Sequence, residues 1–332
     1  MIDIAAPRMR RRVLLGTAGA LLAAPAFAQS NWPSRPLRLV VPWAPGGASD
    51  ALGRLVAGKL SERLGQQVVV DNRAGAGGTV GMAVVSRAAP DGYTLIQATS
   101  TTTGLTPVLM RPEPFDAGRD FAAIAFVALD TNGLFSSAAL PPTSVEELIA
   151  WVRAQTNPVP YASSGVGTLG HLGMELFARA RDLRMTPVPY RGAGPAMADV
   201  VSGTAAAIFT GAIGGRALAE AGRLRLIAVT GARRHADFPA VPTVHELGLG
   251  SMDVPVWHGY MAPPGTPQPI LARLHAAFVA ILGDAEFLAS LDRQMMTPWS
   301  RDQTLADAQG FVIESVLDVR RRIAATGMTA IE

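Results

Sequence analysis

One short stretch of the sequence places an aromatic residue, two glycines and a carboxylate between an apolar run and a helical pattern. Residues 43–50 read Trp-Ala-Pro-Gly-Gly-Ala-Ser-Asp, directly after the apolar run Leu37–Pro42. A strand that passes through glycines into a helix presents free backbone N–H groups and a positive helix end, which suits a small anion. Asp50 either orients a ligand amine or a water, or caps the helix. We expect ligand contacts from Trp43, Gly46, Gly47 and Asp50.

A second glycine-rich stretch, Gly165–Gly170, matches the G-x-G-x-x-G pattern of dinucleotide-binding sites. Such a site also needs an acidic residue at the end of the next strand, about twenty residues on. Asp182 lies only twelve residues past Gly170, before that strand begins, so the pattern argues against a dinucleotide. Hydroxyls and the free amides of a helix start suit an anion instead. The expected ligand contacts here are Ser163, Ser164, Gly165 and Thr168.

Further strand-to-helix junctions carry polar or small residues. Arg191 follows an expected strand end and could bind a carboxylate bidentately, or remain a solvated surface charge. Gly75–Gly78 precedes a helical pattern, and the simplest role of its glycines is to form a turn that needs positive φ. Several such loops together favour an anion site built from backbone groups. We expect further ligand contacts from Thr99, Thr102, Tyr190 and Thr210.

Catalytic and metal-binding patterns are missing from the sequence. It contains no cysteine, no G-x-S-x-G motif and no Walker loop, and His245-Glu246 lacks the second histidine of H-E-x-x-H. The five histidines are scattered without metal-ligand spacing. We therefore expect no catalytic residue, no metal and no cofactor.

The elements that must position these loops alternate between short apolar runs and helical patterns. This alternation predicts α/β sheets with parallel strands and helices on both faces. A capping box at Ser144-Val-Glu-Glu opens one helix. Longer helices are expected at Gln268–Leu282, Asp284–Arg293 and Gln303–Ala325. The expected strands are Leu37–Val41, Gln67–Val70, Tyr93–Ala98, Ala122–Ala128, Val159–Ala162, Thr186–Pro189, Ala205–Phe209 and Leu224–Thr230.

Two strand-like segments, Phe121–Leu129 and Val254–Met261, bracket a block with an α/β pattern of its own. We interpret them as paired crossings between a discontinuous outer lobe, residues 29–125 and 254–332, and an inserted lobe, residues 126–253. A single larger sheet is the alternative. Clefts between two such lobes are favoured ligand sites.

The N-terminal segment has the pattern of an export signal. Four arginines within residues 8–12 precede the apolar stretch Val13–Ala24 and the small residues of Ala26-Phe-Ala, which predicts cleavage after Ala28 and a periplasmic protein. Both the general secretory and the twin-arginine routes fit. Four of the 29 basic and one of the 26 acidic residues lie in this segment, which leaves 25 of each. The balance gives no basic run for nucleic acid.

These motifs, in this order, resemble the Bug family, the extracytoplasmic solute receptors of tripartite tricarboxylate transporters. The resemblance runs from about residue 32 to the C-terminus. The segments that carry it are Trp32-Pro-Ser-Arg-Pro, Pro42-Trp-Ala-Pro-Gly-Gly-Ala-Ser-Asp, Val70-Asp-Asn-Arg-Ala-Gly-Ala-Gly-Gly, Ala89-Pro-Asp-Gly-Tyr-Thr-Leu, Tyr161-Ala-Ser-Ser-Gly, Val188-Pro-Tyr-Arg-Gly and Ala262-Pro-Pro-Gly-Thr-Pro.

The resemblance implies a two-lobed type II periplasmic binding protein (Venus-flytrap) fold that closes over a small carboxylate. The loops Trp43–Asp50 and Ser163–Thr168 would clamp the ligand, which would be a di- or tricarboxylate, an acidic amino acid or an aromatic carboxylate. Expected partners are the membrane subunits of a tripartite tricarboxylate transporter or a sensor kinase, and the protein is expected to be a monomer. Trp43, Thr103 and Thr210 depart from the family's usual Phe or Tyr, His, and Asp or Asn, so ligand identity does not carry over.

One function of a different class remains. A secreted α/β hydrolase or isomerase could act on a carboxylated substrate with the same loops. It would need a positioned base and a nucleophile, and the sequence shows no such pair.

Overall fold

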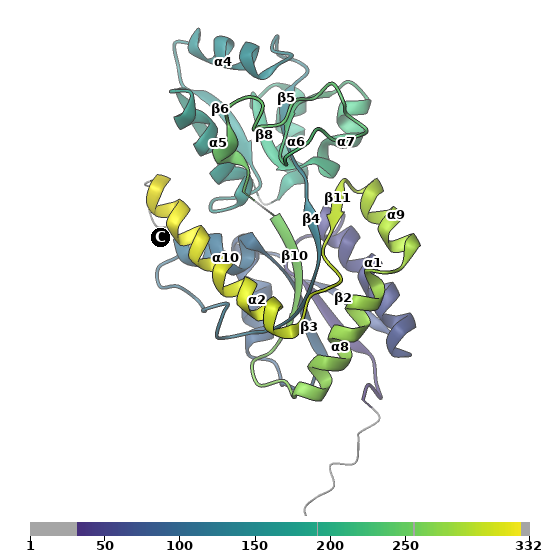
Figure 1. Cartoon of the computed structure of the whole chain (residues 1–332). Helices are drawn as coiled ribbons and strands as arrows, with labels where there is room; N and C mark the ends of the chain where they lie inside the picture. The colour runs from purple at the N-terminus through teal and green to yellow at the C-terminus, as the bar shows by residue number, and fades with distance from the viewer. Residues whose placement is uncertain (1–31, 191, 255, 327–332) are drawn as a thin grey trace, which may run out of the picture.

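Two mixed β-sheets, one in each lobe, form the framework of the protein (Figure 1). The computed structural model describes residues 32–190, 192–254 and 256–326. The first sheet has the strand order β11-β4-β10-β3-β1-β2, with β1 (Leu37–Val41), β2 (Val68–Asn72), β3 (Thr94–Thr99), β4 (Ala122–Asp130), β10 (Val256–Ala262) and β11 (Met296–Pro298). The second has the order β7-β6-β8-β5-β9, with β5 (Asn132–Ser137), β6 (Val159–Ser163), β7 (Met185–Pro189), β8 (Ala207–Gly211) and β9 (Leu224–Val229).

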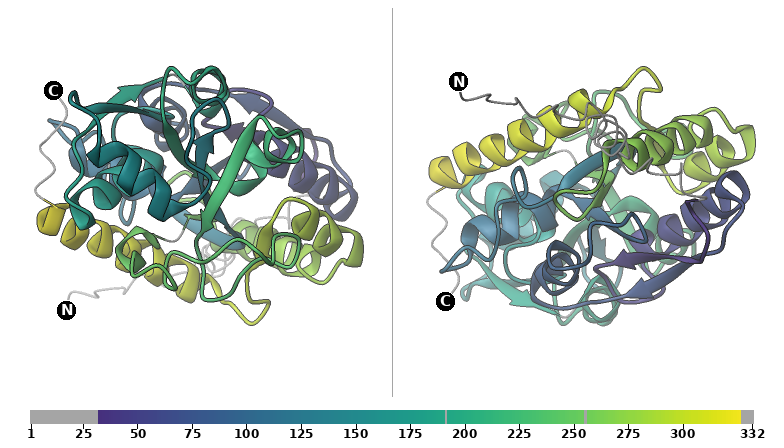
Figure 2. Two further views of the ribbon diagram at one scale, coloured as in Figure 1. Left: turned by 90° about the horizontal axis from the view of Figure 1, so that it is seen from above. Right: turned by 90° about the horizontal axis from the view of Figure 1, so that it is seen from below.

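Each sheet has its own set of helices. Those of the first lobe are α1 (Ala48–Leu64), η1 (Ala76–Gly78), α2 (Thr79–Ser86), the π-helical turn η2 (Thr101–Leu105), α3 (Thr106–Leu109), α8 (Gln268–Ile281), α9 (Ala285–Arg293) and α10 (Leu305–Thr326). Those of the second are α4 (Val145–Arg153), α5 (Leu169–Ala180), α6 (Ala193–Ser202), α7 (Ala212–Glu220) and η3 (Gly250–Met252). Seen from above and below, α10 and the α8–α9 pair lie toward opposite ends of the molecule (Figure 2).

Helices cover both faces of the first sheet, which explains why its strands read as continuous apolar runs. Leu39 of β1 is buried in a cluster with residues of α1 and α8, whereas the next residue, Val40, is buried with residues of α2 and α10. Successive side chains of a strand point to opposite faces, so one apolar run supplies two clusters. The strand is thereby held on both sides, and its carboxyl end is fixed in position.

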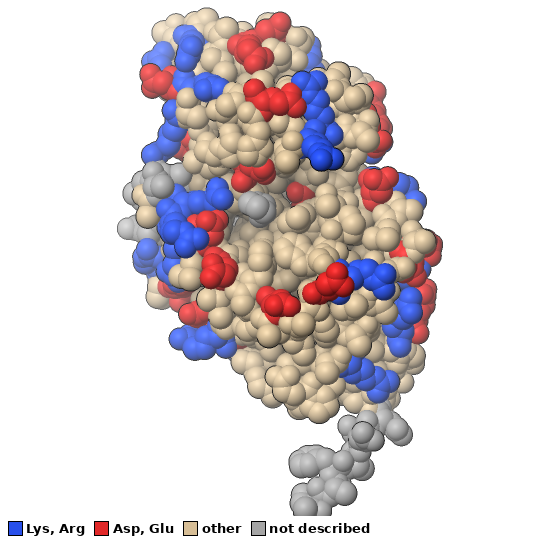
Figure 3. Space-filling view, viewed as in Figure 1, with Lys and Arg blue, Asp and Glu red and all other residues tan. Residues whose placement is uncertain are grey.

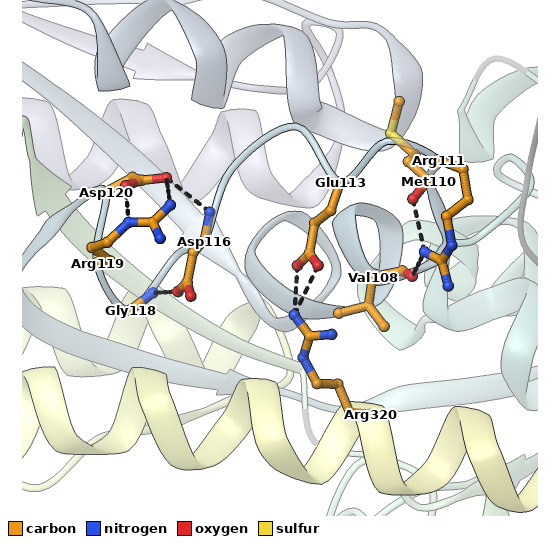
Figure 4. Close-up of polar contacts among 9 residues, drawn as sticks. All are labelled: Val108, Met110, Arg111, Glu113, Asp116, Gly118, Arg119, Asp120 and Arg320. Carbon is orange, nitrogen blue, oxygen red and sulfur yellow. Dashed lines mark hydrogen bonds and ion pairs between the residues drawn. The ribbon is translucent and has the colours of Figure 1, made fainter.

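The long helix α10 is attached to the segment between α3 and β4. Arg320 donates to both carboxylate oxygens of Glu113, at 2.7 and 2.8 Å (Figure 4). In the same segment, Asp120 accepts hydrogen bonds from the Asp116 N–H and from Arg119 (Figure 4). The Arg320–Glu113 pair attaches α10 to this segment, and Val319 of α10 joins an apolar cluster between the lobes.

The sheets are mixed, and the expectation of parallel strands is wrong for the strands next to the crossings. β10 is antiparallel to both β3 and β4, and β5 is antiparallel to both β8 and β9. The reason is topological, because a strand that returns from the second lobe must run opposite to one that leaves the first. β5 and β11 are absent from the expected strands. β5 reads Asn-Gly-Leu-Phe-Ser-Ser, polar at both ends, yet all six residues are buried.

The two expected crossing segments are neighbours in the first sheet. β4 and β10 pair antiparallel, with Asp130 opposite Val256, and together they lead toward the second lobe (Figure 1). The predicted two-lobed α/β fold is therefore confirmed. For the boundaries, β4 continues to Asp130 and β5 begins at Asn132. We propose that the first boundary lies at Thr131 and the second just ahead of β10.

Among the described residues, no single helix has the length and apolarity to span a membrane. Taken together, α8 and α9 have the length and apolar composition of a membrane-spanning segment, but the pair is bent by 71° at the break between the two helices. The expected signal segment and its cleavage after Ala28 lie outside the described residues.

Candidate functional site

The carboxyl ends of six strands face one another between the two lobes. In the first sheet, β1, β3 and β4 all run in the same direction, because β10 is antiparallel to both β3 and β4. In the second, β6 runs parallel to β7 and to β8. The end of β4 leads directly into β5, whose first residue, Asn132, lies opposite Gly211 at the end of β8. The loops that follow these ends therefore line the cleft between the lobes, where open α/β sheets bind ligands.

Four helices begin at these strand ends, each with its positive end toward the cleft loops. Their N-cap residues are Gly47 for α1, Thr168 for α5, Gly192 for α6 and Gly211 for α7. The three glycines cannot cap a helix through a side chain, so amide groups of the first turns stay available, apart from the Ala212 N–H of α7, which donates to the Thr131 carbonyl. Converging helix N-termini attract an anion without a charged side chain.

The first loop, residues 43–50, is held in shape by Asp50. Its carboxylate accepts hydrogen bonds from the Gly46 N–H at 3.0 Å, Arg54 Nε at 3.0 Å and Asn72 Nδ2 at 2.9 Å. Burial raises the pKa of Asp50, but these hydrogen bonds outweigh it and hold the pKa below its ordinary value. With these three donors the carboxylate organises the loop. Asp50 lies in the first turn of α1 but is not the expected cap, because the N-cap is Gly47 and no side chain caps this helix.

Trp43 and Asn72 complete the first loop. Asn72 Nδ2 also donates to the carbonyl oxygen of Trp43, at 3.0 Å. The Trp43 ring packs partly on the core of the first lobe, and its Nε1 is buried without a hydrogen-bond partner in the described residues. Gly46 has φ +87°, which favours glycine, whereas Gly47 has φ −89° and open space around a built Cβ. Asn72 is not among the site residues predicted from the sequence, although it lies within the Val70–Gly78 motif.

The second loop, residues 163–168, is organised by Thr168. The Thr168 hydroxyl donates to the Gly165 carbonyl at 2.8 Å and accepts from the His171 N–H at 3.3 Å, as the N-cap of α5. Ser164 Oγ lies 3.3 Å from Thr168 Oγ1, and Gly165 has φ +142°. Ser163 is fully buried below them. The loop is therefore a fixed turn in which the Ser163 and Thr168 hydroxyls are buried and bonded within the loop, and Ser164 is the hydroxyl residue that is partly exposed.

Gly170 explains why this loop resembles a dinucleotide motif. A Cβ at Gly170 would lie 2.4 Å from the carbonyl oxygen of Phe209, so α5 can approach β8 this closely only with glycine there. The third glycine of the pattern thus serves helix-to-strand packing. No phosphate is needed to account for it.

Tyr190 and Thr210 lie at the ends of β7 and β8. The Tyr190 N–H donates to Ser163 O at 2.9 Å, and the Tyr190 hydroxyl donates to Asp199 of α6. The Asp199 hydrogen bond raises the pKa of Tyr190 to about 12. The hydroxyl is therefore committed to α6, and Tyr190 packs partly against an apolar cluster of the second lobe. Thr210 is partly buried beside Gly211, and Arg191 lies outside the described residues.

The threonines after β3 form a closed local network. Thr99 N–H donates to Thr102 Oγ1 at 2.9 Å, Thr102 N–H to Thr99 Oγ1 at 3.3 Å, and Thr103 Oγ1 to Thr99 O at 2.9 Å. All three residues are buried. Thr99 and Thr102 thus hold a turn at the cleft edge, and their hydroxyls already have backbone partners.

Direct contacts join the two lobes beside the cleft. Thr106 Oγ1 donates to the carbonyl oxygen of Gly167 at 2.9 Å, between α3 and the second loop. A buried apolar cluster lies next to it, formed by Leu105, Leu109 and Val319 of the first lobe, Leu169 and Leu172 of the second, and Val254. A Cβ at Gly77 would meet Thr106 Oγ1 at 2.5 Å, so the loop Gly75–Gly78 packs against Thr106. No local pattern in the sequence indicates this contact.

The cations near the described cleft loops are paired with carboxylates. Arg54 pairs with Asp50, and Arg73 with Asp71. In the described part of the chain, no group of three or more His, Cys, Asp or Glu side chains could hold a metal ion. On the face shown in Figure 3, acidic and basic side chains are interspersed, and uncharged residues cover much of the middle. Among the described loops, the groups left to face a negative charge are therefore backbone amides and helix ends.

Comparison with known proteins places these features in a family. Residues 52–328 match the family described as tripartite tricarboxylate transporter family receptor. The chain is 33% identical over 307 residues to Protein BugT of Bordetella pertussis, covering 92% of each protein. It superimposes on the solved periplasmic binding protein BugD with a TM-score of 0.84 at 28% identity, covering 90% of this chain and all of that one. The R. palustris protein Rpa4515, solved with adipate, gives a TM-score of 0.85 at 32% identity, covering 90% of this chain and all of that one.

Proposed function

The chain belongs to the tripartite tricarboxylate transporter receptor family, with the Bug proteins, and on this basis we propose that it holds a small carboxylate between its lobes in the periplasm. The ligand is a di- or tricarboxylate, an acidic amino acid or an aromatic carboxylate. The loaded protein delivers it to the membrane subunits of a transporter or to a sensor kinase. It acts as a monomer after cleavage behind Ala28.

The observation that carries this proposal is the convergence of the α1, α5, α6 and α7 N-termini at the cleft. Their amides and dipoles favour an anion. A carboxylate small enough to lie between both lobes would contact the loops 43–50 and 163–168 at once. A relative solved with adipate supports a carboxylate as the class of ligand.

The alternative, an enzyme acting on a carboxylated substrate, finds less support in the described residues. His275 directs both ring nitrogens to backbone carbonyls, of Ile124 and Gln303. His171 Nδ1 lies 3.3 Å from the Gly167 N–H, and His258 Nδ1 lies 3.2 Å from Gln97 Nε2. These imidazoles have structural partners, whereas a general base needs one nitrogen directed at a nucleophile.

Native mass spectrometry of the protein, purified from the periplasm of the cells that produce it, tests the proposal. We expect a bound species whose mass matches a mono-, di- or tricarboxylic acid, released on denaturation. The released acid, returned to the protein in excess, should be recovered unchanged. A bound cation or neutral sugar would contradict the carboxylate, and conversion of the acid would support the enzyme instead.

A further inference from the structure

Asp130 ends a strand of the first lobe, but its side chain lies against the second lobe. It ends β4 at the crossing, opposite Val256 of β10 and Met296 of β11. Its carboxylate oxygen Oδ2 lies 2.7 Å from where a Cβ would stand on Gly211, at the end of β8 in the other lobe. The carboxylate is thus wedged between the strand ends of both lobes, at the base of the cleft.

The Asp130 carboxylate lacks the partners that other cleft carboxylates have. Its Oδ1 is buried with no hydrogen-bond partner among the described residues, and no ion pair with a described cation involves it. By contrast, Asp50 accepts three hydrogen bonds and Asp199 accepts one from Tyr190. Buried polar groups are nearly always paired, so an unpaired carboxylate oxygen at a ligand cleft needs an explanation.

A structural role for Asp130 at the adjoining helix does not supply this explanation. Gly211 precedes α7, and that helix has no side-chain cap. The Ala212 N–H at its start donates to the Thr131 carbonyl at 2.7 Å, not to Asp130. Burial raises the pKa of the Asp130 carboxyl to about 7, as expected of a group without a compensating partner.

We infer that Asp130 selects ligands which carry a hydrogen-bond donor, a hydroxyl or an ammonium, in addition to their carboxylate. This inference rests on the proposed function. The ligand carboxylate lies at the helix N-termini, and the donor group of the ligand reaches the Asp130 carboxylate at the base of the cleft. The preferred class is accordingly hydroxy- or amino-substituted carboxylates over the plain acids of equal length.

Calorimetric titration with matched ligands tests the inference. The series are succinate, malate and aspartate, then glutarate, 2-hydroxyglutarate and glutamate, and benzoate with its hydroxy and amino derivatives. In the wild-type protein, the donor-bearing member of a binding series should bind at least about tenfold more tightly than the plain acid, as expected for a hydrogen bond to a charged group. Asp130→Ala should reduce this ratio to within about threefold, leaving plain-acid binding similar.

Two further variants test whether the preference depends on the charge of Asp130 and on its position. Asp130→Asn keeps an acceptor oxygen but removes the charge, so it should retain a preference for a hydroxyl and lose a preference for an ammonium. Asp302→Ala, at an exposed position before α10, is the control and should keep the wild-type ratio. Asp130→Ala removes a carboxylate whose Oδ1 is buried and unpaired, so it should fold at least as stably as the wild type.

The outcomes separate the two proposals. A donor preference that survives in Asp130→Ala, or carboxylate binding with no donor preference in the wild type, overturns this inference and leaves the receptor function standing. Failure of every carboxylate to bind the wild-type protein overturns the proposed function, and this inference with it.

Discussion

The hydroxyl of Thr106 donates a hydrogen bond to the carbonyl oxygen of Gly167, 2.9 Å away and in the other lobe. The bond is buried and stands beside the apolar cluster that joins α3 and α10 to α5. It therefore fixes the second cleft loop against the first lobe in the arrangement that the structure shows.

Thr106→Val should weaken closure, because it leaves the buried Gly167 carbonyl without a donor. An unsatisfied buried acceptor costs about 1–3 kcal/mol, so ligand affinity should fall by roughly tenfold. Calorimetry measures the affinity, and small-angle scattering of the ligand-free protein should show a larger radius of gyration. Thr79→Val is the matched control, because Thr79 Oγ1 donates to Ala76 O at 2.8 Å within one lobe. Equal losses in both variants would argue against a role in closure.

Gly47→Val should block the ligand without disturbing the fold. Gly47 has φ −89°, and a built Cβ meets nothing closer than Ala44 O at 4.0 Å. A side chain there fits the protein and projects from the start of α1, where the ligand carboxylate is proposed to bind. We expect calorimetric binding to fall by more than about tenfold, or roughly 1.4 kcal/mol, with the melting temperature of the free protein nearly unchanged. Gly58→Val, also open but mid-helix in α1, should bind normally.

Trp43 should report ligand binding through its fluorescence. It is the tryptophan of the first cleft loop, whereas Trp257 is buried and donates from Nε1 to Ser315 Oγ at 2.8 Å. A ligand at a hundred times its dissociation constant adds about 2.7 kcal/mol to the free energy of unfolding, which raises the melting temperature. Trp43→Phe should keep this thermal shift and lose most of the emission change. An unaltered emission change in the variant would place the ligand away from this loop.

His258 and Asp130 should give opposite slopes of stability with pH. Burial lowers the pKa of His258 from 6.5 to about 4, so the unfolded chain takes up the proton first and stability falls as pH drops from 6.5 toward 4. Burial raises the pKa of Asp130 from 3.8 to about 7, so the folded state takes up the proton first and stability falls as pH rises from 3.8 toward 7. Within their shared window, the two contributions largely cancel.

Single substitutions separate these contributions. Relative to the wild type, Asp130→Asn should lose stability more steeply on acidification, and His258→Asn more steeply as pH rises. Each slope is at most about 1.4 kcal/mol per pH unit. Urea unfolding midpoints, measured at several pH values in this window, give the slopes. If both variants follow the wild-type profile, neither group titrates differently in the folded and unfolded states.

Much of the site could be predicted because its requirements are local. A glycine at a strand-to-helix junction is needed for the backbone path itself, as the positive φ of Gly46 and Gly165 shows. The N-cap Thr168 bonds the amide three residues on, and Asp50 bonds that of Gly46, four residues back. β1, with its unbroken apolar run, is found at the bounds the sequence predicts.

The remaining features depend on residues that are distant in the chain. Nothing within the sequence around Thr106 indicates Gly167, 61 positions away, or that Asp130 would meet Gly211. β5 could not be recognised because its polar ends are paired and buried only between β8 and β9. Sequence by itself thus determined the fold class and the loops that offer backbone amides, since these follow from patterns of neighbouring residues. Strand direction, lobe contacts and the unpaired carboxylate at the base of the cleft were decided only by tertiary structure, because they depend on where the chain returns.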